Sequence, residues 1–87
     1  MDNSHRIELM QELLASLEPS HMNIIDESHL HAGHAGAKEG KGHFRLQIAS
    51  PRFDGLRLIQ SHRLIYETLG DMMQTDIHAL SIELVAH

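Results

Sequence analysis

The sequence HFRLQIA at residues 43–49 alternates apolar and polar side chains, and this stretch decides the fold. Phe44, Leu46 and Ile48 fall on one face, and the residues between them fall on the other. A period of two is typical of a strand that packs one face on a core and turns the other to water. The stretch therefore predicts a half-buried strand that opens at His43.

The segments on the C-terminal side predict a helix and a further strand. Residues 58–73 carry an apolar stripe with a period of 3.6, which indicates one amphipathic helix, or two helical pieces if it loosens near Gly70. Residues 77–85 alternate again and predict another strand. A helix of this length between the strands permits a parallel crossover. The stripe consists of Leu58, His62, Ile65, Leu69 and Met72.

The segments on the N-terminal side complete a small α+β fold. Residues 4–17 predict a helix and residues 21–28 a short strand, while the glycine-rich residues 28–43 predict a loop. Three short strands cannot bury both faces by themselves, so we expect the helices to cover one face of the sheet. The apolar residues of the first helix are Ile7, Met10, Leu13, Leu14 and Leu17.

Length and composition exclude several classes of protein. A chain of 87 residues predicts a single domain over 1–87. The absence of cysteine excludes a disulfide framework and a thiolate site contributed by this chain. The sequence shows no membrane span and no secretory signal, so we expect a cytoplasmic protein. No nucleophile elbow or phosphate-binding loop is present, and we do not expect an enzyme.

Histidine is the unusual residue, with nine in the chain. His29, His31 and His34 lie in the glycine-rich loop, while His43 and His78 each open a predicted strand. If these two strands are parallel neighbours, both histidines lie at the same edge of the sheet. Imidazole is a ligand for zinc, copper, iron and nickel, so this edge is a candidate metal site. The alternatives are a solvated histidine-rich loop and a loop that binds free metal ions.

Two histidines carry further structural expectations. His78 shares its parity with Leu80, so we expect it on the packed face of its strand, at the end where the core meets solvent. His62 lies on the apolar stripe of the long helix, which favours a core histidine hydrogen-bonded to a carbonyl or carboxylate over a metal ligand.

The arginines give a second candidate site. Arg52, Arg57 and Arg63 cluster in the turn and the long helix, which permits a local basic face that binds nucleic acid. The alternative is that they are ordinary solvated side chains. A formal net charge of −5 supplies no general attraction to nucleic acid.

Taken together, the motifs resemble those of the BolA family over nearly the whole chain. The glycine-rich loop contributes, and so do Asp26-Glu27-Ser28, His43-Phe44, Ser50-Pro51-Arg52-Phe53-Asp54-Gly55, His62-Arg63-Leu64-Ile65-Tyr66 and His78-Ala79-Leu80. The resemblance implies an αββααβ fold with a small mixed sheet, similar to class II KH domains.

The resemblance also implies a cofactor and a partner. BolA-like proteins share a bridging [2Fe–2S] cluster with a monothiol glutaredoxin, whose cysteine and bound glutathione ligate one iron. The family's ligands match His78 and either His43 or His31, and nothing carries over to His34. The implied function is a non-enzymatic accessory role in iron–sulfur trafficking or iron sensing. Alone, the chain is expected to be a monomer or a weak homodimer.

The family's second implied function is a DNA-binding transcriptional regulator of cell morphology and stress response. The implicated region is the loop before the long helix and the helix itself. Where the family usually has Arg-His-Arg, this sequence has Ser61-His62-Arg63. The loss of one arginine removes about one potential phosphate contact.

Overall fold

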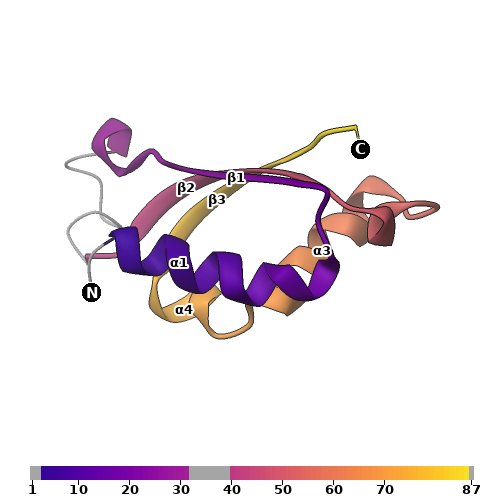
Figure 1. The fold of residues 1–87 in the computed structure, drawn as a ribbon. Coiled ribbons are helices and arrows are strands. Elements are labelled where there is room, and N and C mark those ends of the chain that lie inside the picture. Colours follow the sequence, from indigo (N-terminus) through magenta and orange to yellow (C-terminus); the bar gives the residue numbers. More distant parts are fainter. Residues whose placement is uncertain (1–2, 32–39, 87) are drawn as a thin grey trace.

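The structure is a computed structural model that describes residues 3–31 and 40–86, with Leu30 and His31 described by their backbone alone. This part of the chain contains three strands, three α-helices and three short 3₁₀ turns (Figure 1). The elements are α1 (Asn3–Leu14), η1 (Ala15–Leu17), β1 (His21–Asp26), η2 (Ser28–His31), β2 (Gly42–Ala49), η3 (Pro51–Phe53), α3 (Leu58–Leu69), α4 (Met72–Thr75) and β3 (Ile77–Leu84). The predicted order αββααβ is confirmed.

The sheet is mixed, as predicted, with β2 in the centre. β1 pairs with β2 antiparallel and β3 pairs with β2 parallel. Figure 1 shows the helices α1, α3 and α4 together on one side of the sheet. Because β2 and β3 are parallel neighbours, their N-terminal ends meet at the same edge. The expected α+β fold with helices on one face is confirmed.

The core lies between the sheet and the helices. Its central strand contributes the three apolar residues of the alternating stretch, all of them buried. The buried apolar cluster consists of Met10, Leu14, Leu17, Ile24, Phe44, Leu46, Ile48, Ile65, Leu69, Met72 and Ile77. Burial of these side chains is the main favourable term that orders so short a chain.

The buried side of α1 differs from the predicted one. Arg6, Met10 and Leu14 are buried, at a spacing of four residues, whereas Leu13 is 40% exposed. The prediction that Leu13 belongs to the core stripe is therefore wrong. An arginine takes the first position of that stripe, and its charge requires polar partners within the fold.

The predicted helix over 58–73 is divided into α3 and α4. Gly70 lies between them with φ +58° and ψ −130°, a positive-φ conformation that glycine adopts at little cost and that interrupts the helix. Leu58 was expected in the core but is 64% exposed, because the start of α3 lies at the end of the molecule away from the N-terminus (Figure 1). The buried residues of α3 are Ser61, Ile65 and Leu69.

The segment after β1 is the part least like the prediction. The strand ends at Asp26 rather than at residue 28, and the backbone of Ser28–His31 forms a 3₁₀ turn where a loop was expected. Much of the predicted loop, including His34, lies outside the described residues. Among the helices that the structure describes, none is long and apolar enough to cross a membrane.

Candidate metal centre

The imidazole rings of His43 and His78 lie together at the N-terminal edge of β2 and β3. Their ring centroids are 5.0 Å apart, with an interplanar angle of 49°. This proximity follows from the parallel pairing of the two strands, each of which carries its histidine within its first two residues. The predicted meeting of the two histidines at one sheet edge is thus confirmed.

The two rings differ in their exposure. His78 is exposed, whereas His43 is only 3% exposed and both of its ring nitrogens are buried. A molecule that approaches this edge therefore reaches the imidazole of His78 first. His43 would have to turn its ring outward to reach such a molecule, because both of its ring nitrogens are buried.

His78 lies on the opposite face of the sheet from the predicted one. Gly42 pairs with Ile77, but His43 pairs with Ala79, so β3 holds one extra residue at His78. A bulge of this kind disturbs the strict alternation of side chains. Ile77 is buried in the core, and His78 turns to the outer face, where it meets the ring of His43.

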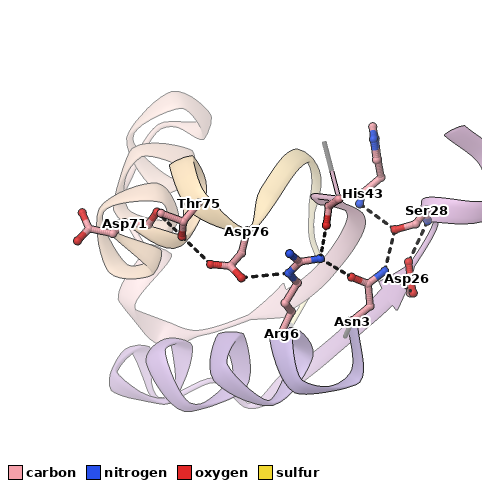
Figure 2. Close-up of polar contacts among 9 residues, drawn as sticks. Asn3, Arg6, Asp26, Ser28, His43, Asp71, Thr75 and Asp76 are labelled. Atoms are coloured by element: carbon pink, nitrogen blue, oxygen red, sulfur yellow. Dashed lines mark hydrogen bonds and ion pairs between the residues drawn. The ribbon is translucent and has the colours of Figure 1, made fainter. Parts of the chain in front are cut away.

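A polar network on the first turn of α1 surrounds the start of the two strands (Figure 2). Arg6 Nε donates to Asp76 Oδ2 at 3.0 Å, and Arg6 Nη1 donates to the carbonyl oxygen of Gly40 at 2.7 Å. Nη1 also donates to Asn3 Oδ1 at 3.0 Å. The guanidinium of the buried residue Arg6 thereby obtains the partners that its charge requires.

The network continues through Asn3 to the segment beside β2. Asn3 Nδ2 donates to Asp26 Oδ2 and to Ser28 Oγ, each at 3.0 Å. Ser28 Oγ in turn accepts the backbone N–H of His43 at 3.0 Å, as Figure 2 shows. Glu27 N donates to the carbonyl oxygen of His43 at 2.8 Å. Both backbone polar groups of His43, its N–H and its carbonyl oxygen, are therefore hydrogen-bonded.

Both carboxylates of the network are held in their charged form. Hydrogen bonds from Thr75 and from Arg6 lower the pKa of Asp76 in spite of the opposing effect of burial. Burial raises the pKa of Asp26, but hydrogen bonds from Ser28 and Asn3 outweigh it and lower the pKa. The network therefore depends on both groups being ionised.

The other histidines add no ligand among the described side chains. His62 is half-buried, and its Nε2 is buried with no hydrogen-bond partner among residues 3–31 and 40–86, so the expected hydrogen bond is absent at this nitrogen. The side chain of His31 lies outside the described part of the chain, and so does all of His34. Within the described residues, no three histidine or carboxylate side chains are grouped to hold a metal ion.

The candidate nucleic-acid residues lie elsewhere on the molecule. Arg52 and Arg57 follow the C-terminal end of β2, at the opposite end of that strand from His43, and Arg63 is exposed on α3. Arg52 makes a weak contact with Glu18, whose carboxylate is 3.6 Å away. The structure thus separates the expected arginine site from the histidine pair.

Comparison with known proteins identifies the family. The family model described as BolA-like protein matches residues 13–87. The chain belongs to the BolA family. Among solved structures, it resembles BolA1 from Arabidopsis thaliana, with a TM-score of 0.75 and 41% identity, covering 91% of this chain and 88% of that one. The BolA domain of SufE1 from Arabidopsis thaliana gives a TM-score of 0.78 and 36% identity, covering 95% and 92%.

Curated BolA relatives carry several names. The chain is 42% identical to Protein BOLA1, chloroplastic, of Arabidopsis thaliana, over 85% of this chain and 48% of that protein. It is 35% identical to the DNA-binding transcriptional regulator BolA of Escherichia coli, over 88% of this chain and 70% of that protein. The chain spans about half the length of the first of these BolA relatives. Neither name describes an enzyme.

Proposed function

We propose that this BolA-family protein is a non-enzymatic accessory protein that binds a [2Fe–2S] cluster jointly with a monothiol glutaredoxin, in iron–sulfur trafficking or iron sensing. The observation that carries the proposal is the pair of imidazole rings of His43 and His78 at one sheet edge, 5.0 Å between centroids, with the side chain of His78 exposed. Adjacent imidazoles from two strands are a suitable donor pair for one side of a cluster.

The donor chemistry of the chain fits a shared cluster rather than a complete one. The chain has no cysteine, and its described residues hold no group of three ligand side chains. The thiolates would come from the cysteine of the glutaredoxin and from glutathione. When bound, the cluster supplies one-electron redox chemistry, and imidazole ligands raise its reduction potential relative to thiolates.

His78 is the ligand best supported by the structure, because its side chain is exposed beside that of His43. For the second ligand, the ring contact supports His43, while the side chain of His31 lies outside the described part of the chain and stays an alternative. His43 would have to turn its imidazole toward the partner, since both ring nitrogens are buried in the chain alone. This chain's own contribution is to hold the two side chains at one edge, where the side chain of His78 is accessible to a partner protein.

The test is to mix the chain with cluster-loaded monothiol glutaredoxin and glutathione, and to record visible absorption and circular dichroism. We expect His78→Ala to change the spectrum of the mixed complex and His21→Ala, an exposed histidine at the start of β1, to leave it unchanged. Comparison of His43→Ala with His31→Ala then identifies the second ligand. A mixed-complex spectrum that His78→Ala does not alter would overturn the ligand assignment.

A second candidate function, a DNA-binding transcriptional regulator, is favoured by the name of the Escherichia coli relative and by the exposure of three arginines. Each arginine that contacts a phosphate should contribute about one unit to the slope of log affinity against log salt. We expect Arg63→Gln to lower that slope by about one unit in a mobility-shift titration. Failure to shift any DNA at low salt would remove this function for the isolated chain.

A further inference from the structure

The side chain of Arg6 connects the segments that lead into both histidine-bearing strands. Asp76, which accepts from its Nε, comes two residues before His78. Gly40, whose carbonyl oxygen accepts from its Nη1, comes three residues before His43. A planar guanidinium can bind both acceptors at once because its N–H groups diverge in a fixed fork.

Further hydrogen bonds complete the connection between the strand ends. Gly42 N donates to the carbonyl oxygen of Asp76 at 2.9 Å, which joins the two segments directly. On the other side of β2, Asn3 binds Ser28, whose Oγ accepts the N–H of His43. One turn of α1 therefore restrains the chain on both sides of the histidine pair.

The regular sheet ladder does not provide this restraint by itself. The pairing of β2 with β3 shifts by one residue between Gly42 and His43, so the ladder is irregular at the position where the two imidazoles meet. A bulged residue is unpaired in the ladder and its backbone bends locally. The separation of the rings consequently depends on contacts outside the sheet.

We propose that Arg6 and Asp76 are positioning residues for the histidine pair: they tie the N-terminal ends of β2 and β3 together and so keep the rings of His43 and His78 next to each other at the edge where a shared ligand would bind. The proposal rests on the proposed cluster-binding function for the identity of that ligand. Neither residue touches the ligand, and both act through the placement of the strands.

The ring-to-ring nuclear Overhauser effect between His43 and His78, measured in the chain alone, tests the placement. Asp76→Asn keeps the shape of the side chain and removes its charge. Asp71→Asn removes the same charge from an exposed position where, among the described residues, hydrogen bonds go to the backbone oxygen rather than to the carboxylate. This effect varies with the inverse sixth power of distance. A loosening of about 1 Å from 5.0 Å should therefore weaken it roughly threefold.

We expect the weakening in Asp76→Asn and not in Asp71→Asn, with the far-ultraviolet circular dichroism of both retained. An unchanged effect in folded Asp76→Asn would overturn the proposal. If Asp76→Asn does not fold, the same measurement on Arg6→Lys decides, because lysine keeps the charge but cannot span both acceptors. Retention of the full ring-to-ring effect in folded Arg6→Lys would also overturn it.

The mixed complex with glutaredoxin gives the readout that a purely structural role would not change. We expect Asp76→Asn to shift the visible circular dichroism and the midpoint potential of the cluster, while Asp71→Asn matches the unsubstituted chain. If the unsubstituted chain forms no mixed cluster, the proposed function fails, and the ring-to-ring measurement still decides whether Arg6 and Asp76 position the histidines.

Discussion

Arg6 Nε lies 3.0 Å from Asp76 Oδ2, in an ion pair between residues 70 positions apart in the chain. Their side chains are only 11% and 15% exposed. Removal of one partner leaves the other charge poorly solvated, so Arg6→Met should lower the free energy of unfolding by about 1.5–3 kcal/mol. Urea denaturation followed by circular dichroism measures this loss.

The matched control is Arg63→Met, which makes the same change at an exposed position of α3 and should alter stability by less than about 0.5 kcal/mol. The double variant Arg6→Met with Asp76→Asn should lose less than the sum of its single losses, because the second change removes a charge already left alone. If the stability lost in the double variant equals the sum of the two single losses, Arg6 and Asp76 do not interact directly.

Acid should weaken the fold through Asp26 and Asp76. Both have a pKa below the ordinary value of 3.8, so each contributes stability that is complete above that value and is lost as the pH falls through the lower pKa of the folded state. We expect the urea concentration at the unfolding midpoint to decrease once the pH drops below about 4. In Asp76→Asn this decrease should be less steep. If the urea midpoint decreases with acid as steeply in Asp76→Asn as in Asp71→Asn, this prediction is wrong.

Gly42→Ala should disturb the core beneath the histidine pair. A Cβ at this position would overlap the ring of Phe44, which is itself buried, and would lie 3.1 Å from Asn3 Oδ1. Overpacking of this kind typically costs about 1–3 kcal/mol of stability. Thermal or urea unfolding gives the size of the loss.

The overlap with the ring predicts a specific rescue. Phe44→Leu removes ring atoms that the new Cβ would meet, so it should cost less stability in the Gly42→Ala background than in the original chain. Equal losses in the two backgrounds would show that Gly42→Ala acts through the backbone instead.

Ser50→Ala should destabilise the junction between η1 and η3. The buried Ser50 Oγ donates to the carbonyl oxygen of Leu17 and accepts the N–H of Arg52 at 3.0 Å. Without the hydroxyl, the carbonyl oxygen of Leu17 loses its donor from Ser50. We expect the free energy of unfolding to fall by about 1–3 kcal/mol. Ser81→Ala, at an exposed position of β3, is the control and should change the urea midpoint little. Equal effects at the two serines would contradict the assigned role.

The sheet could be predicted from sequence because its signal is local. The alternation of Phe44, Leu46 and Ile48 places those side chains on one face whatever the rest of the chain does. The meeting of His43 with His78 then follows from parallel pairing. The face of His78 could not be predicted, since a single bulge reverses parity and depends on how the two strands fit together.

Arg6 was missed because its partners are distant in sequence. Its position four residues before Met10 places it on the buried stripe of α1, and that spacing was the available signal. Nothing local indicates that Asp76 and Gly40 would meet it there. The exposure of Leu58 is similarly a matter of where α3 begins relative to the sheet, which periodicity does not report.

The long span of the contact between Arg6 and Asp76 also sets an order of assembly. Closing a longer loop costs more chain entropy, and contacts between distant parts of a chain slow folding because that cost comes before their benefit. We expect the hairpin of β1 and β2 to form early and this contact to close last. The histidine edge is then the region that a nascent chain completes at the end of folding.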